Sequence, residues 1–255
     1  MLRLEREGTI ATVLLDRPEK LNAVDRSLWP LLEAAFRDLD ADESVRCVVL
    51  RGAGSNFAAG ADIAEFPAVR TGSAAAREFA VAMHAALRAI AGCRHPTLAL
   101  IEGVCVGGGL ELAACCDLRI AAASSRFGVP IARIGVTMAA PEVSLLLELV
   151  GAAGLLSILL EGRVFGADEA LALGLLTHVV PDARVEEEAL LSAQRIAQGA
   201  PLVHRWHKRI IRRLRDPRPL APDEEDGALE TFDSADFREG IAAFLAKRKP
   251  VFEGK

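Results

Sequence analysis

Runs rich in β-branched residues alternate with helical patterns through the first two thirds of the chain. This alternation is typical of α/β domains, in which helices pack on the faces of a sheet. The remaining third has a mainly helical pattern, and the sequence pattern changes near Pro201. We therefore predict an α/β domain in residues 1–200 and a C-terminal helical subdomain in residues 201–255.

The predicted elements follow from periodicity and from helix start and stop signals. Ser27 is expected to cap the first helix, with Pro30 in its first turn. The predicted strands are residues 1–8, 9–15, 45–51, 97–102 and 118–122. The predicted helices are residues 27–39, 74–91, 141–149, 152–160, 168–173, 185–197, 202–214 and 234–247.

Composition argues against several classes of partner. The net charge of −5 and a pI near 5.6 disfavour a general affinity for polyanions. The one basic run, residues 205–218, is followed by the acidic residues 223–226, so we expect a solvated helix face and no nucleic-acid partner. No uncharged apolar stretch reaches the roughly 18 to 20 residues that cross a bilayer, so we expect no membrane partner.

The cysteines and the N-terminus indicate an intracellular environment. The five cysteines are odd in number and form no Cys-x-x-Cys pair, which favours buried free thiols over disulfides or a zinc site. The N-terminus alternates apolar and charged residues and lacks the apolar stretch of a signal peptide. His204 and His207 stand three apart on a predicted helix without an acidic or cysteine partner, so we expect no metal. We therefore expect a cytoplasmic location.

Two segments rich in small residues each follow a predicted strand. Residues 56–62 read Asn-Phe-Ala-Ala-Gly-Ala-Asp, and in residues 102–113 a Gly triplet, Gly107 to Gly109, leads into a helix. Glycines allow a backbone to approach a ligand closely, and the unpaired N–H groups at a helix start suit an oxyanion or an anionic group. No nucleotide-phosphate motif is present in either segment. Tight turns and close helix packing are the alternative explanation.

These segments resemble those of the crotonase superfamily, the enoyl-CoA hydratase/isomerase family. The other matching pieces lie in the family's order and cover nearly the whole chain: residues 16–23, 116–117, 126–128, 174–176, 179–181 and 239–249. The resemblance implies a crotonase-like spiral of ββα units with a C-terminal helical subdomain that packs homotrimers or a dimer of trimers. It implies an acyl-CoA or enoyl-CoA substrate, with coenzyme A as part of that substrate and no permanently bound cofactor.

The resemblance also implies roles for individual residues. The backbone N–H groups of Ala61 and Gly108 would donate to the thioester oxygen, and Glu111 would act as general acid or base. A carboxylate in a first helical turn is also favoured by the helix dipole alone. The residues implied to contact coenzyme A are Arg17, Lys20, Ala23, Ala59, Asp62, Ile63, Gly107, Lys247 and Lys249.

The chain departs from the family where hydratases carry a second glutamate. That position is Ile131, which cannot transfer a proton. Glu142 is the nearest acid, and it could act as a catalytic replacement or as a cap in a first helical turn. A lone Glu111 could also isomerise a double bond or assist decarboxylation or loss of another leaving group. An acyl-CoA-binding scaffold that has lost its chemistry is a further alternative.

Overall fold

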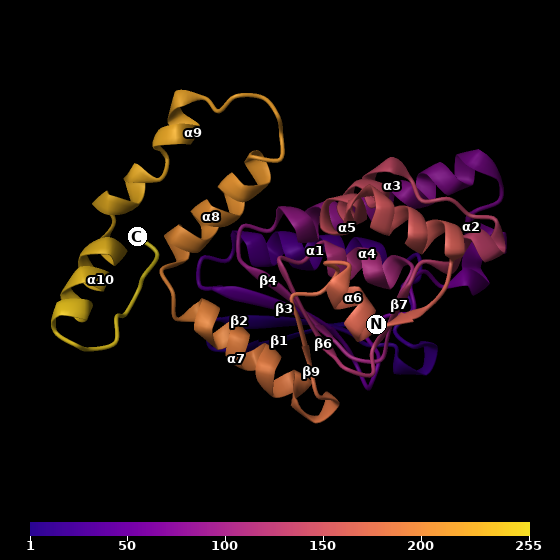
Figure 1. Ribbon diagram of the computed structural model, residues 1–255, viewed down its shortest axis with the longest axis horizontal. Coiled ribbons are helices and arrows are strands. Elements are labelled where there is room, and N and C mark those ends of the chain that lie inside the picture. Colours follow the sequence, from indigo (N-terminus) through magenta and orange to yellow (C-terminus); the bar gives the residue numbers. More distant parts are fainter.

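The computed structural model describes all 255 residues, and its centre is a six-stranded sheet (Figure 1). The strand order is β1-β2-β3-β4-β6-β9, with β1 and β2 antiparallel and the other neighbours parallel. A three-stranded sheet, β5-β7-β8, lies at its side. The strands are β1 Leu2–Glu7, β2 Ile10–Leu15, β3 Cys47–Gly52, β4 Thr97–Ile101, β5 Val104–Val106, β6 Leu118–Ala122, β7 Arg126–Gly128, β8 Phe165–Gly166 and β9 His178–Val180.

Ten α-helices and five 3₁₀ turns surround the strands. The helices are α1 Leu28–Ala41, α2 Phe66–Val69, α3 Gly72–Gly92, α4 Gly108–Ala114, α5 Ala140–Glu161, α6 Ala167–Ala172, α7 Val185–Ala197, α8 Pro201–Arg213, α9 Pro222–Asp226 and α10 Ala235–Leu245. The 3₁₀ turns are Pro18–Lys20, Ile63–Glu65, Pro130–Ile134, Asp182–Arg184 and Leu229–Asp233.

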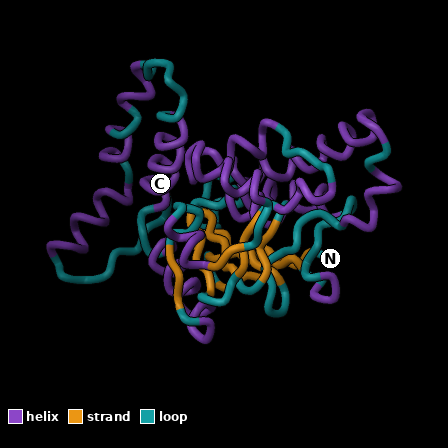
Figure 2. Tube along the Cα trace, turned by 45° about the vertical axis from the view of Figure 1, so that its right-hand side comes forward, coloured by secondary structure: helices purple, strands orange, loops and turns teal.

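The sheet is a central layer with helices on both faces (Figure 2). The main core holds 40 buried residues and joins one face of the sheet to α1, α3, α4 and α5. A second cluster of 10 buried residues joins the other face to α7. Strand β4 is buried along its whole length, as expected for a parallel strand covered on both sides. The five cysteines are buried and free, which confirms the prediction made for them.

One local prediction, the helix cap at Ser27, needs correction. Ser27 already has helical backbone angles, and its side chain makes no cap bond. The Oδ1 atom of Asp25 accepts instead from the backbone N–H groups of Ser27 and Leu28, each at 3.0 Å. The break predicted between helices at residues 141–149 and 152–160 is confirmed: both segments belong to α5, and the backbone between them is non-helical at Gly151, where φ is +66°.

Helices α8 to α10 and the final residues, which we call the C-terminal arm (residues 201–255), project from the body of the molecule (Figure 1). The arm is nevertheless joined to the sheet by a buried ion pair. Lys208 Nζ lies 2.5 Å from Asp117 Oδ2 and donates to the His95 carbonyl oxygen at 2.6 Å. Arg212 Nη2 lies 3.0 Å from Asp117 Oδ1. The domain boundary at residue 200 therefore stays a prediction.

Helix α5 is long and apolar enough to cross a membrane by length and composition alone. Only 17% of its most apolar 18-residue window is buried in the chain. Leu156 and Leu160 are 56% and 77% exposed on it. The same helix carries the buried Glu142 near its start and pairs Glu148 with Arg215 of the C-terminal arm. In the isolated chain, α5 thus packs on the core through Leu146, Leu155 and Ile158 and leaves other apolar side chains uncovered.

Candidate active site

The two small-residue segments predicted from the sequence lie against each other beyond the carboxyl ends of β3 and β4. In open α/β sheets, this is the edge at which ligands bind. Single parallel bridges join Ala58 to Cys105 and Val24 to Ala61. Gly60 has φ of +90°, and a Cβ there would lie 2.9 Å from Gly108 N. The two backbones therefore approach more closely than side chains would allow.

Two asparagines, the buried Asn22 and the part-buried Asn56, hold this backbone in place. Asn22 is 0% exposed, and its Nδ2 donates to the carbonyl oxygens of Ala53 at 2.9 Å and Asn56 at 2.7 Å. Asn56 Oδ1 in turn accepts from Val104 N at 2.9 Å. In an irregular segment, some backbone N–H and C=O groups have no partner in a neighbouring strand. The asparagine side chains supply hydrogen bonds to such groups here. The site backbone is thus fixed by side-chain hydrogen bonds.

Ala61 N–H and Gly108 N–H donate no hydrogen bond within the protein. Gly108 is the first residue of α4, so its N–H has no intrahelical acceptor. An ideal Cβ on Gly108 would lie 3.4 Å from Ala61 N, which shows how closely the two groups lie. Both residues are part-exposed, unlike the buried Gly60 and Gly109 beside them. Two adjacent free donors of this kind can receive one oxygen atom that carries negative charge.

Glu111 lies in the first turn of α4, and it is buried, with 6% of the residue exposed. The pKa of Glu111 is raised to about 8, mainly by burial and also by the charge of Glu142, while Arg70 opposes the rise. No donor in the protein contacts the Glu111 carboxyl group. At pH 7 this carboxyl group therefore carries a proton and can act as a general acid.

The raised pKa makes stability depend on pH. The unfolded chain releases the Glu111 proton near the ordinary value of 4.5, and the folded chain near 8. Below pH 4.5 both states hold the proton, so nothing is lost; as the pH rises to 8, the folded state becomes less stable. Glu111→Gln has no such proton and does not lose stability in this way. Its free energy of unfolding, relative to that of wild type, should therefore be about 4 kcal/mol higher at pH 8 than at pH 4.5. Denaturant titrations at both pH values measure this gain, and a difference that does not change with pH contradicts it.

Glu142 is buried near Glu111, with 3% of the residue exposed. Its Oε1 lies 2.6 Å from Nε2 of His84, and its Oε2 accepts from the backbone N–H of Ala139. The cap contact predicted for Glu142 is present, and a second contact ties it to α3. His84 is a site residue that our sequence analysis missed, because nothing in the pattern of α3 shows which turn lies over the site.

Arg70 completes the charged groups of the site. Its Cζ lies 4.3 Å from the Phe66 ring centroid and 4.0 Å from the Phe79 ring centroid. Burial lowers its pKa, and the charges of Glu111 and Glu142 act in the opposite direction. No pattern in the sequence indicated a site role for Arg70 either.

The residues predicted to contact coenzyme A differ in their burial and in their contacts within the chain. Arg17 already pairs with Asp25 at 3.0 Å and Asp62 at 3.2 Å, which gives it a structural role beside the site. Ala23 is buried, whereas Ala59 and Gly107 are part-exposed along the segments that carry the free donors. Lys20 and Ile63 are exposed nearby, in the two 3₁₀ turns that follow β2 and the first small-residue segment.

Lys247 and Lys249 are not brought to this site by their own chain. Both are exposed and follow α10 in the C-terminal arm. Figures 1 and 2 place α10 at the opposite end of the molecule from α2. The reason is that the arm projects outward after α8. Their role as coenzyme A contacts therefore stays a prediction that one chain alone does not support.

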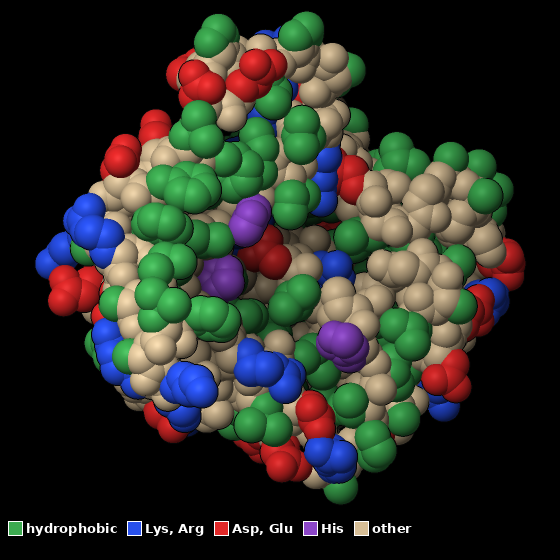
Figure 3. All heavy atoms as spheres, turned by 60° about the vertical axis from the view of Figure 1, so that its left-hand side comes forward, with side chains coloured by type: hydrophobic (Ala, Val, Ile, Leu, Met, Phe, Trp, Pro, Cys, Tyr) green, Lys and Arg blue, Asp and Glu red, His purple; other side chains and the backbone are tan.

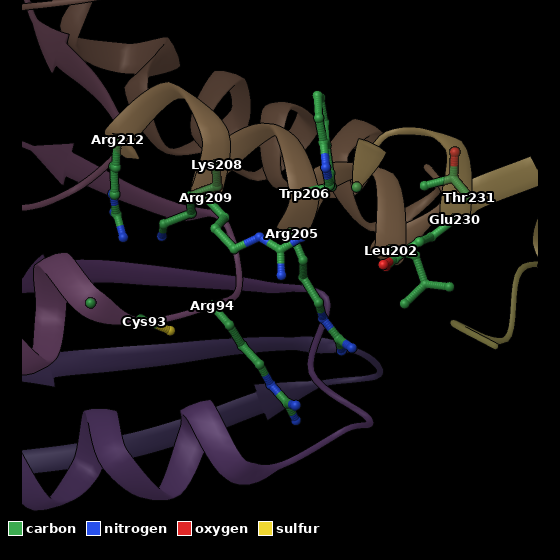
Figure 4. Close-up of a pocket in the computed structure, with 12 residues that line it drawn as sticks. Cys93, Arg94, Leu202, Arg205, Trp206, Lys208, Arg209, Arg212, Glu230 and Thr231 are labelled. Atoms are coloured by element: carbon green, nitrogen blue, oxygen red, sulfur yellow. The ribbon is translucent and has the colours of Figure 1, made fainter. Parts of the chain in front are cut away.

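A cavity of about 720 Å³ lies elsewhere, between α8, the end of α3 and the residues that follow α9. Basic side chains of α8 and Arg94 dominate it (Figure 4). Figure 3 shows a hollow with histidine and charged side chains at its edge on the side of the molecule that carries the arm. None of the predicted site residues lines this cavity. No group of three or more His, Cys, Asp or Glu side chains is placed to hold a metal ion.

Comparison with known proteins identifies the class. A family model described as enoyl-CoA hydratase/isomerase matches residues 5–255. The chain is 32% identical to the mevalonyl-coenzyme A hydratase SIDH of Beauveria bassiana, covering 96% of this chain and 91% of that protein. It is 32% identical to the short-chain-enoyl-CoA hydratase of Clostridium acetobutylicum, covering 96% and 95%.

Solved structures agree with this result. An enoyl-CoA hydratase/carnithine racemase from Magnetospirillum magneticum matches with a TM-score of 0.98 at 48% identity, covering 100% of this chain and 96% of that one. The chain therefore belongs to the enoyl-CoA hydratase/isomerase family, and its predicted α/β crotonase fold is confirmed.

Proposed function

We propose that this protein is an enoyl-CoA hydratase that adds water reversibly across the double bond of an acyl-CoA thioester. The family membership and the hydratases among its relatives support the reaction class. The observation that carries the proposal is the pair of free N–H groups, Ala61 and Gly108, beside the buried, protonated Glu111. Coenzyme A enters as part of the substrate, and we propose no resident cofactor.

The proposed steps use two donors and two acids. The thioester oxygen accepts hydrogen bonds from Ala61 N–H and Gly108 N–H, which stabilise the negative charge that develops there. The Glu142 carboxylate takes a proton from water, and the water oxygen bonds to the β-carbon. Glu111 gives its proton to the α-carbon. Addition of one water is then complete, and one proton passes from Glu142 back to Glu111 before the next turnover.

Glu142 is the proposed replacement for the missing second glutamate. Ile131 is part-buried and packs against the main core, where it can supply no proton. Glu111 and Glu142 instead have different surroundings, since His84 and a backbone N–H contact only Glu142. Carboxyl groups in contrasting surroundings can divide the roles of acid and base. His84 positions the carboxylate of Glu142.

Glu142→Gln should lower the hydration of crotonyl-CoA by ~10²-fold, because the base is lost while the oxyanion donors remain. His84→Gln should lower it less and shift the pH profile of kcat, since Glu142 keeps its carboxylate. Stopped assays of the 3-hydroxyacyl product measure both. Glu148→Gln, on the same helix but in a surface pair with Arg215, is the matched control and should remain near wild type.

Isomerisation of a double bond by Glu111 alone is a second candidate. The observation that favours it is that each carboxylate oxygen of Glu142 already has a hydrogen-bond partner, His84 or the Ala139 N–H. A carboxylate bound in this way is less free to take a proton from water, which leaves Glu111 as the one acid that exchanges protons with the substrate. A 3-enoyl-CoA is the discriminating substrate. If it is isomerised at the same rate by wild type and Glu142→Gln, while crotonyl-CoA is not hydrated, the isomerase assignment replaces the hydratase.

The apolar surfaces of the chain support a homotrimer or a dimer of trimers as the proposed assembly. Four apolar side chains of α10 are 40% to 81% exposed: Phe237, Ile241, Phe244 and Leu245. Exposed apolar faces of this size on helices require a partner surface. We propose that a second copy covers them, together with the open face of α5, and that the assembly is cytoplasmic.

A further inference from the structure

Arg70 is a guanidinium without a partner at the edge of the candidate active site. It lies between the Phe66 and Phe79 rings, which its Cζ approaches to 4.3 and 4.0 Å. Its Nε is buried and has no hydrogen-bond partner, and the side chain forms no ion pair. Aromatic faces attract a cation, but they satisfy none of its directed N–H donors. The guanidinium is thus held in place with its hydrogen bonds unused.

The structure connects Arg70 to the acids of the site. Phe79, which packs on Arg70, is a buried residue of α3, and His84 lies little more than one turn further along the same helix. His84 contacts Glu142, and both Glu111 and Glu142 act electrostatically on Arg70. Arg70 therefore borders the space in which the acyl group of a substrate would react.

The carboxyl groups of the site do not balance the charge of Arg70. Glu142 is already in contact with His84 and the Ala139 N–H. Glu111 is in its neutral form at pH 7. An arginine that only neutralised these acids would be expected within ion-pair distance of one of them, and it is not. A part-buried cation without a counterion is costly, and an anionic group on a ligand relieves that cost.

We propose that Arg70 binds a carboxylate on the acyl chain, so that the substrates of this enzyme are CoA thioesters of dicarboxylic acids. The proposal rests on the function proposed above. A guanidinium can donate two parallel hydrogen bonds to a carboxylate, which fixes the orientation of the chain as well as its charge. Phe66 and Phe79 hold the guanidinium in position and reduce the conformational freedom lost on binding.

Binding of matched thioesters tests the proposal. The pairs are succinyl-CoA with butyryl-CoA, glutaryl-CoA with pentanoyl-CoA, and adipyl-CoA with hexanoyl-CoA, each measured by calorimetry on the intact protein. In at least one pair, the carboxylated member should bind wild type roughly 10-fold or more tightly than its uncharged partner. Arg70→Gln should abolish that preference without weakening the uncharged member, and Arg70→Lys should retain part of it.

Arg77→Gln is the matched control, because Arg77 is exposed at the start of α3 and should leave the preference unchanged. Equal binding within all three pairs overturns the proposal, and so does a preference that survives in Arg70→Gln. Failure of both members of every pair to bind removes the proposed function itself. The uncharged thioesters also report whether Arg70→Gln keeps an intact site.

Discussion

Glu111→Gln should reduce the turnover of an enoyl-CoA by ~10²- to 10⁴-fold, the usual contribution of a positioned general acid. Glutamine has nearly the shape of the protonated carboxyl group that the folded protein holds at pH 7, but it cannot give up a proton. The acyl-CoA dissociation constant should therefore change little. Steady-state rates and calorimetry with a saturated acyl-CoA separate the two effects.

Glu102→Gln is the control for Glu111→Gln. Glu102 is a part-buried glutamate at the start of the second small-residue segment, and it pairs with Arg51 at 3.4 Å. Its replacement should leave turnover close to wild type. A Glu111→Gln protein that keeps most of its turnover would show that another group gives the proton, and the role assigned to Glu111 would then be wrong.

Ala61→Pro should lower kcat/KM by ~10²- to 10³-fold, because it removes one of the two N–H groups proposed to bind the thioester oxygen. That N–H makes no hydrogen bond in the free protein, so its loss breaks no internal bond. The effect should appear in reactions of thioesters and not in the affinity for coenzyme A itself. Rates with crotonyl-CoA and titrations with coenzyme A provide the measurement.

Ala61→Gly keeps the N–H group and serves as the matched control for Ala61→Pro. It should retain turnover within a few-fold of wild type, since the Cβ of Ala61 is not part of the proposed interaction. Circular dichroism and thermal unfolding of both variants check that each keeps the secondary structure and stability of wild type. Equal losses in the two variants would assign the effect to the side chain and contradict an oxyanion hole at Ala61.

The fold could be predicted where local pattern and burial agree. β3, β4 and β6 are mainly apolar because both faces of the sheet are covered, and all three were predicted close to their observed bounds. β5, β7, β8 and β9 were missed, since two or three residues carry no periodic signal. The cap assigned to Ser27 was wrong because Asp25, two residues earlier, accepts from the backbone N–H groups of Ser27 and Leu28, and Ser27 itself already has helical backbone angles.

The candidate site was only partly predictable. Ala61, Gly108 and Glu111 lie in segments whose residue types are set by the close approach of two backbones, and that constraint is visible in the sequence. His84 and Arg70 reach the site from α3 and from the end of α2, so their positions depend on how these segments pack over α4 and α5. Whether Lys247 and Lys249 meet coenzyme A depends on contacts between chains, which one sequence does not encode locally.

Mass spectrometry of purified wild type incubated with crotonyl-CoA tests the central claim most directly. We predict a product heavier by one water, formed at an ordinary enzymatic rate of about 1 to 10³ per second and lost in Glu111→Gln. The same product formed equally fast by wild type and Glu111→Gln would contradict the account, as would a crotonyl-CoA that binds wild type and remains unchanged.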